Sequence, residues 1–249
     1  MAEYLLVPGD PDRVPKIAKL WDSAKEVSSH REFRSFTGAY KGVPISALSS
    51  GIGPACMAIA FNEASNIGVH TFIHVGSTAA IQEDIDCGDL IISSSAVRLD
   101  CTSDCYVMPQ YPATANYEVL LALIEAAERM GVSNHHVGIT ATTADFYAGQ
   151  SRPMKVPASQ DLFTILRRAR VLNFEMETAT LFTLASLNAL RAGSVCTVFA
   201  NRCRNEFMEG AGEENATKVA NEAVKILRGW DDLKKKEKKR WYFPSLARA

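Results

Sequence analysis

Short apolar segments alternate with longer amphipathic ones along most of this chain. The apolar segments are compact and lie beside Gly, Pro or Asp residues, which is the pattern of strands that are buried on both faces of a sheet. On this basis we predict strands at residues 4–7, 72–75, 90–92, 137–139 and 195–199.

The intervening segments predict helices. Residues 116–130 carry an apolar stripe at helical spacing, and Gly131 follows as a stop signal. Residues 177–190 are apolar nearly all round, which indicates a helix packed deep against the sheet, and residues 213–227 predict a final amphipathic helix. Alternating strands and helices imply crossover connections. We therefore expect an α/β fold, a three-layer αβα sandwich with a mixed central sheet, in which residues 1–249 form a single domain.

Charge and composition exclude several classes of protein. The 249 residues carry 27 Lys+Arg against 28 Asp+Glu, a formal net charge of -1, whereas nucleic-acid binders are normally basic. The N-terminus has no secretory signal, and Gly and Pro residues interrupt the uncharged stretch 42–62, unlike a membrane-spanning helix. Six cysteines without CxxC spacing indicate reduced thiols. We expect a soluble, cytoplasmic protein that binds neither nucleic acid nor membrane.

The C-terminal tail, about residues 230–249, differs from the rest. Residues 234–240 hold six basic residues and one Glu, followed by Trp241, Tyr242 and Phe243. One interpretation is a basic arm for nucleic acid, a membrane surface or nuclear import. The other is a solvated helix end whose aromatic residues dock on the body or on a neighbour. The second is preferred, because no other basic cluster reinforces the first.

Three residues suggest chemistry on their own. Gly9 and Arg13 lie in a Gly-Asp-Pro-Asp-Arg turn after the first predicted strand, where backbone N–H groups and a guanidinium would suit an anion. A plain structural turn explains the same residues equally well. Glu177 stands in an otherwise apolar helical segment. Since a buried, unpaired carboxylate is energetically costly, a functional role is the better explanation for Glu177.

Two other clusters carry weaker signals. Asp100, Cys101, Asp104 and Cys105 offer metal-binding atoms, but zinc sites usually have CxxC or paired-His spacing, so loop thiols are the preferred interpretation. The adjacent pair at positions 135–136, both His, is most simply explained as a surface turn.

Taken together, the motifs resemble the nucleoside phosphorylase family, in particular its pyrimidine-specific members. The resemblance is collinear from about residue 4 to about residue 227, and the tail lies outside it. It rests on GDPDRV at 9–14, SHREF at 29–33, SSGIG at 49–53, HVGSTAAIQ at 74–82, FYAGQSR at 146–152, NFEMETAT at 173–180 and NRCRNE at 201–206. It implies the family's αβα sandwich and reversible phosphorolysis, in which uridine and phosphate give uracil and ribose 1-phosphate.

The resemblance also assigns residues to roles. The phosphate-binding positions would be Gly9, Arg13, Arg31, His74 and Ser77. The ribose-binding positions would be Met176, Glu177 and Ser77. The base-binding positions would be Thr78, Ala79, Phe146, Gln150, Arg152 and Glu175, with Glu206 as a further base-side group. The catalytic residues would be Glu177, Arg202 and Arg13.

The same resemblance implies no metal and no cofactor, because phosphate is a co-substrate. Relatives hold a monovalent cation between subunits with a Glu that matches Glu32 and a serine whose place Cys56 takes, so we do not predict that ion here. Arg31 would reach the neighbouring subunit's phosphate site, which implies a homo-oligomer, either a dimer or a hexamer of dimers. Purine-specific relatives have a Ser-Asp pair where this chain has Asn201-Arg202, which favours a pyrimidine substrate.

Two departures from the family bear on activity, and the one at His74 matters more. His74 stands where the family has a phosphate-binding arginine, and an imidazole is only partly charged near neutral pH. Ala79 replaces a glycine, which is tolerable only if its φ is negative. The alternatives to an active phosphorylase are a non-catalytic nucleoside-binding paralogue and a nucleoside hydrolase.

Overall fold

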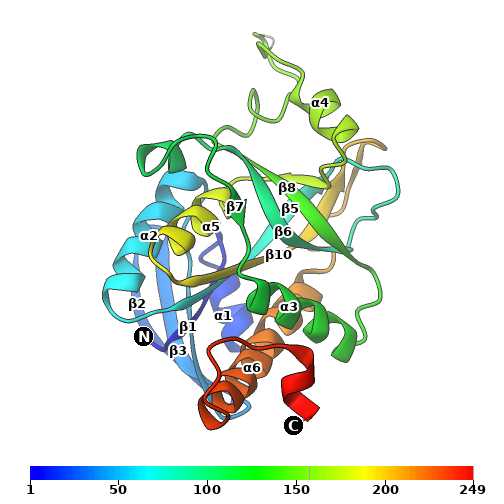
Figure 1. Ribbon diagram of the computed structural model, residues 1–249. Coiled ribbons are helices and arrows are strands. Elements are labelled where there is room, and N and C mark those ends of the chain that lie inside the picture. The colour runs from blue at the N-terminus through cyan, green and yellow to red at the C-terminus, as the bar shows by residue number, and fades with distance from the viewer. Residues whose placement is uncertain (157, 249) are drawn as a thin grey trace.

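The computed structural model describes residues 1–156 and 158–248 (Figure 1). The strands are β1 (Tyr4–Val7), β2 (Ser23–His30), β3 (Phe33–Tyr40), β4 (Val43–Leu48), β5 (Thr71–Ala80), β6 (Leu90–Leu99), β7 (Ala113–Thr114), β8 (His135–Thr143), β9 (Asn173–Glu175), β10 (Arg191–Asn201) and β11 (Glu206–Phe207). The helices are α1 (Arg13–Ala18), α2 (Pro54–Asn66), α3 (Tyr117–Arg129), α4 (Leu162–Arg168), α5 (Thr178–Leu187), α6 (Glu213–Lys236) and the short 3₁₀ segments η1 (Ser103–Cys105) and η2 (Pro244–Arg248).

The strands form one mixed sheet in the order β11-β10-β6-β8-β9-β5-β1-β4-β3-β2, with β7 paired to β6. Strand β5 also pairs with β10, so that β5, β10, β6, β8 and β9 close into a ring. Within this sheet β1, β4, β5 and β10 are mutually parallel neighbours, whereas β2 and β3 form an antiparallel hairpin at the edge. The expected mixed sheet is confirmed.

Helices cover both faces of the sheet, as expected for three layers (Figure 1). On one side, α1, α3 and α6 bury apolar side chains, among them Ile17, Leu123 and Leu227, against the sheet. On the other side, α2 and α5 contribute Phe61 and Phe182 to a second cluster. Buried apolar area is the main source of stability, so these two clusters hold the layers together.

The predicted elements lie where the pattern placed them, but several are longer. Strand β6 continues seven residues past the predicted end at 92, and α6 extends nine residues past 227. Gly131 adopts a φ of 69° after α3, which confirms it as the helix stop. The pair at 135–136 begins β8 rather than forming a turn, so that prediction was wrong. The uncharged stretch 42–62 contains β4 and most of α2, and no helix in the described part of the chain is long and apolar enough to cross a membrane.

The C-terminal segment packs on the body, and Glu118 ties it down. The carboxylate of Glu118 is 2% exposed and accepts hydrogen bonds from Lys234 Nζ (2.6 Å), Arg191 Nη1 (3.0 Å) and the backbone N–H of Tyr242 (3.0 Å). The Tyr242 ring stacks on Trp230 at 4.0 Å between centroids. The expectation that tail aromatics dock on the body holds for Tyr242.

Replacing Glu118 with glutamine is expected to destabilise the protein by about 2–4 kcal/mol, because Lys234 and Arg191 would lose a buried charged partner. Urea unfolding checks the value. The matched control is Glu214→Gln, which removes only the exposed pair with Lys218 and should change stability by less than about 0.5 kcal/mol. Equal effects of the two substitutions would show that Glu118 does not hold the segment.

Candidate active site

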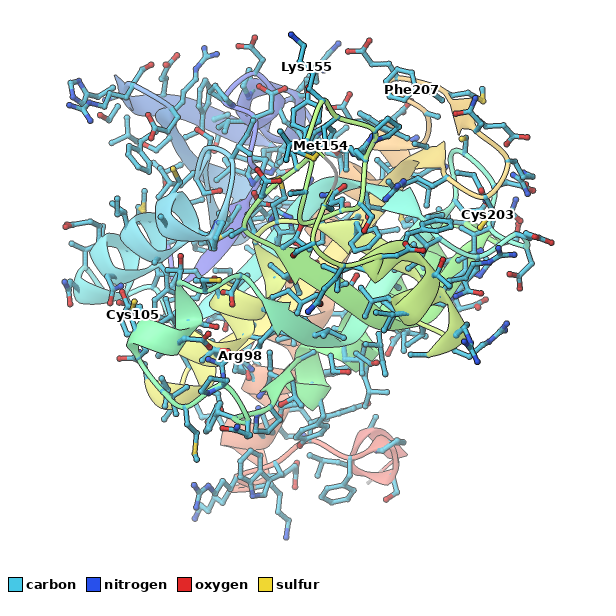
Figure 2. The ribbon with its side chains drawn as sticks, turned by 90° about the horizontal axis from the view of Figure 1, so that it is seen from above. Arg98, Cys105, Met154, Lys155, Cys203 and Phe207 are labelled. Carbon is cyan, nitrogen blue, oxygen red and sulfur yellow. The ribbon has the colours of Figure 1, made fainter. Side chains whose placement is uncertain are left out.

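A cavity of about 710 Å³ lies at the edge of the sheet where parallel strands end. Its lining follows the carboxyl ends of β1, β4, β5 and β10, which is the usual place for ligands in open α/β sheets. Figure 2 shows Met154 and Lys155 of the long β8–α4 connection and Phe207 of β11 in the upper part of the view, with Arg98 and Cys105 below them. Of these labelled residues, only Phe207 lines the cavity.

One end of the cavity is suited to an anion. Gly9 follows β1, and a Cβ at this position would lie 3.2 Å from the Gly51 carbonyl oxygen, so the two loops require close backbone approach. Arg13, the first residue of α1, is 6% exposed; its Nε donates to Glu213 at 2.8 Å and its Nη1 to the Val75 carbonyl at 3.1 Å. Ser77 is an exposed position of β5 in the same lining. The predicted phosphate residues of this chain, Arg31 excepted, therefore meet here.

Two buried carboxylates form the centre of the site. Glu175 accepts four hydrogen bonds, from the Thr142 hydroxyl and from the Glu177 N–H, the Thr178 N–H and the Thr178 hydroxyl. It thereby caps the N-terminus of α5 and satisfies backbone donors there. Glu177 accepts from the backbone N–H of Gly53 at 2.5 Å and lines the cavity. Glu175 is thus held by its neighbours, whereas Glu177 has capacity for further donors.

The other end of the cavity combines an amide and a guanidinium. Gln150 is 2% exposed, and its side-chain oxygen accepts from Nε and Nη2 of Arg152, each at 3.3 Å. The Arg152 guanidinium lies 3.9 Å from the centre of the Phe146 ring, and burial lowers its pKa. This part of the lining, which we call the base-side wall, offers hydrogen-bond donors and acceptors beside an aromatic ring, as recognition of a planar heterocycle requires.

Strand β5 forms the floor between the two ends. Thr78 lines the cavity, and its hydroxyl donates to the Phe174 carbonyl (2.6 Å) and accepts from Asn173 (2.7 Å), so this side chain is committed to the protein. Ala79 lies within β5 and is not among the residues with positive φ, so the condition for replacing glycine is met.

The protonation states of the central groups differ from those in water. Burial, together with the nearby charge of Glu175, raises the pKa of Glu177 to about 8. Burial lowers the pKa of His74 to about 4, so this imidazole is neutral near pH 7 in the unliganded site. The lowered pKa moves the titration of His74 below the range of pH 6 to 8, contrary to what its sequence position suggested.

Three side chains of the site are close enough to share a metal ion, because one possible ligand atom of each lies within 4.8 Å of the other two. They are His74, Glu175 and Glu177. The four hydrogen bonds that Glu175 already accepts leave it little capacity for an ion. The expectation that the site needs no metal stays a prediction. Cys56 donates to Glu32 at 3.7 Å. The expectation that these two residues hold no monovalent cation also stays a prediction. Cys101 and Cys105 are exposed free thiols, in keeping with the loop interpretation.

Three predicted residues do not line the cavity. Arg31 is at the tip of the β2–β3 hairpin with a φ of 54°. Arg202 donates to the carbonyl oxygens of Gln150 and Ser151 and lies behind the wall, where burial lowers its pKa to about 10. Glu206 pairs with Arg204 on the exposed β11 turn. Arg202 thus supports the base-side wall in this structure rather than forming its surface.

The cavity also has apolar lining that the sequence reasoning missed. These residues are Ile52, Phe174, Phe199 and Phe207. Ile52 is 76% exposed and Phe207 is 68% exposed, so both stand at the mouth. In the sequence, Phe207 is a single aromatic residue that follows the polar run 201–206, and this position could have indicated an exposed aromatic side chain.

The cavity lining defines a site for a polar ligand: it combines the guanidinium of Arg13, the carboxyl groups of Glu175 and Glu177, and the amide and guanidinium of Gln150 and Arg152. The chain belongs to the Phosphorylase superfamily, whose family model matches residues 3–229. Uridine phosphorylase of Thermococcus kodakarensis is 57% identical to it, over 99% of this chain and 90% of the relative. Uridine phosphorylase of Escherichia coli K12 is 38% identical, over 91% of this chain and 92% of the relative. Guanosine phosphorylase of Halorubrum lacusprofundi is 36% identical, over 80% of this chain and 78% of the relative.

Proposed function

We propose that this protein is a pentosyltransferase that converts uridine and phosphate reversibly to uracil and ribose 1-phosphate. The observation that carries the proposal is that one cavity is lined by Arg13 and Gly9, by Glu177, and by Gln150 and Arg152. These three sets of groups suit the phosphate, the ribose and the base of a single nucleoside complex. The relatives that are named for uridine cover nearly the whole chain and support the choice of substrate.

In the proposed reaction, the bond between C1′ and the base nitrogen breaks with its electron pair going to uracil, while a phosphate oxygen forms the new bond to C1′. The transition state gathers positive charge on the sugar ring, which the carboxylate of Glu177 stabilises while it accepts hydrogen bonds from ribose hydroxyls. The guanidinium of Arg152 favours the negative charge that develops on the base oxygen, and Gln150 orients the base. Arg13 and Gly9 hold the phosphate for attack. Arg202 acts on the reaction through the wall that it supports.

Incubation with uridine in the presence and absence of phosphate tests the proposal. Uracil release that requires phosphate supports the phosphorylase. Release without phosphate would favour a hydrolase, and binding of uridine without any release would favour a nucleoside-binding paralogue.

The working form that we propose is a homo-oligomer in which Arg31 enters the partner's phosphate pocket. Arg31 is next to Glu32, which lines the cavity, yet Arg31 does not line the cavity of its own chain. Strand β2 is exposed along its whole length, and Ile52 and Ile59 expose apolar surface on neighbouring elements. A second copy seated on this face would cover both features. Six free cysteines fit a reducing compartment, so we propose the cytoplasm as the place of action.

Mixing a Glu177→Ala chain with an Arg31→Ala chain is expected to restore activity that neither chain has alone. In each mixed dimer, one pocket keeps Glu177 of its own chain and Arg31 of the partner, so random pairing gives about a quarter of wild-type sites. Uracil release after subunit exchange measures this. A mixture no more active than its parents would place Arg31 in its own subunit's site or outside any site.

A further inference from the structure

His74 is oriented by its surroundings toward Glu177. The imidazole is 1% exposed, and its Nδ1 lies 2.9 Å from the Val7 carbonyl oxygen. Because a carbonyl oxygen only accepts, Nδ1 carries the proton and Nε2 of the neutral ring presents a lone pair. That lone pair is 3.7 Å from Oε2 of Glu177 and 4.0 Å from Oε2 of Glu175.

The surroundings of Glu175, Glu177 and His74 determine which of these three side chains holds a proton. Glu175 accepts four hydrogen bonds, which favour its charged form, whereas the Gly53 N–H is the backbone donor to Glu177. Burial and the charge of Glu175 favour a protonated Glu177, whose pKa is about 8. Burial keeps His74 neutral. The raised pKa of Glu177 and the lowered pKa of His74 thus favour a carboxylic acid that faces an imidazole lone pair.

The other ionisable groups facing His74 and Glu177 do not change this balance. Arg13 opposes a charge on His74 and favours one on Glu177. Cys196 of β10 is fully buried, and burial raises the pKa of its thiol, so it stays neutral. Arg13 is itself engaged by Glu213 at 2.8 Å. Within one chain, the only guanidinium beside His74 in the described cavity lining is therefore that of Arg13, and Glu213 compensates much of its charge, so a cationic His74 would strengthen phosphate binding.

We propose that phosphate binding beside His74 moves the proton of Glu177 from Oε2 to Nε2 of His74. The O–H bond of the carboxylic acid breaks, an N–H bond forms, and the total charge of the pair is unchanged. The imidazolium then faces the phosphate, and the carboxylate is ready to accept ribose hydroxyls. The distance of 3.7 Å between Nε2 and Oε2 is longer than a hydrogen bond, and an approach of roughly 0.5–1 Å closes it.

This inference rests on the proposed function, because it takes the end of the cavity near Arg13 and His74 as the phosphate site. The proposed proton transfer makes the charge of Glu177 depend on the binding of phosphate. Phosphate would convert Glu177 into its active form, so that the nucleoside meets a charged carboxylate only when the co-substrate is present. Where the family has a permanently charged arginine, His74 would then become positively charged only when phosphate is bound.

Nitrogen NMR of the imidazoles tests the transfer directly. The chain has five histidines, and a variant with asparagine at His30, His70, His135 and His136 retains His74 as the one imidazole. At pH 8 without phosphate, its nitrogen shifts are expected to show the neutral ring with the proton on Nδ1. Saturating inorganic phosphate is expected to shift both nitrogens to imidazolium values. A ring that remains neutral at saturation overturns the proposal.

Proton counting provides a second measurement in the unmodified chain. Calorimetric titration with inorganic phosphate in two buffers of different ionisation enthalpy is compared between wild type and Glu177→Gln. Titration of phosphate itself cancels in the difference. The wild type supplies the proton internally, whereas the variant must take about one more proton from solvent to charge His74. Equal uptake by both proteins would contradict the transfer, whether or not uridine is cleaved. Conversely, a charged His74 without phosphate-dependent uracil release would contradict the proposed function alone.

Discussion

Replacing Glu177 with glutamine is expected to lower kcat/KM for uridine by about 10³-fold. The amide has nearly the same shape, but it cannot carry the charge that stabilises the sugar cation, and one of its two polar ends donates instead of accepting. Loss of a single preorganised charge-stabilising group typically lowers the rate by about 10²–10³-fold, and the change here also weakens hydrogen bonds to the ribose hydroxyls. Steady-state assays of uracil release measure the effect.

Glu214→Gln is the matched control for this substitution, since it makes the same chemical change on the exposed side of α6 and should leave kcat/KM unchanged. Glu177→Gln should also fold. A variant that retains more than about a tenth of wild-type kcat/KM would remove Glu177 from the centre of the mechanism.

The same variant gives a stability test with a defined sign. The pKa of Glu177 is raised to about 8, above the unfolded value of about 4.3, so the native state retains a proton that the unfolded state loses. The contribution of this group is therefore greatest below about pH 4.3 and decreases as pH rises to about 8. Wild-type stability should fall relative to Glu177→Gln across this range, which urea unfolding at several pH values measures. Parallel curves would show that Glu177 is ionised in the empty site.

Uridine is expected to be preferred over inosine by at least about 10³-fold in kcat/KM. A pocket that would leave buried polar groups unpaired with the wrong base discriminates strongly. Gln150 and Arg152 are such groups, since Gln150 is 2% exposed and is already hydrogen-bonded to Arg152 on one side. A purine would have to pair with the same wall while occupying more of the cavity. Comparable kcat/KM for inosine would show that the base wall reads a different ring.

Gln150→Leu extends this test to a single side chain. It should lower uridine turnover by about 10²-fold or more while the melting temperature changes little, because leucine has similar volume and the backbone carbonyl that Arg202 holds is retained. The control is Gln160→Leu in the same connection, at an exposed position outside the cavity lining. Equal losses for the two substitutions would indicate a general effect on this segment.

Much of the sheet could be predicted from the sequence, because its strands are continuous apolar runs. Strand β1 was predicted at its observed bounds, and α3 to within a residue at each end. The edge hairpin was not predicted, because every residue of β2 is exposed and its sequence has no apolar alternation. Helix α2 was also missed, since the glycines before it suggested only turns.

The family motifs pointed to more of the residues that line the cavity than physical chemistry alone did. Glu177 alone was indicated by the cost of burying a carboxylate, whereas Gln150 and Arg152 required the family resemblance. The state of His74 required the structure, because burial rather than residue type sets its charge. The position of Arg202 behind the wall could not be inferred either, since its two carbonyl partners lie some fifty positions away in the chain.

Because Arg202 anchors the base-side wall, it determines which segments can be exchanged between this protein and its relatives. Its guanidinium holds the carbonyls of Gln150 and Ser151 while lying 4.9 Å from the ring centre of Phe163 and 5.5 Å from that of Phe174. An aspartate at this position, as in the purine-type pattern, has no N–H groups for those carbonyls. A purine-type relative that received only the β8–α4 connection would have no arginine to hold the carbonyls of that connection. Replacing only the β10–β11 turn of this protein by the purine-type turn would remove Arg202 and leave the same carbonyls without their donor. The two segments therefore form one module, and a change of base preference by recombination has to move them together.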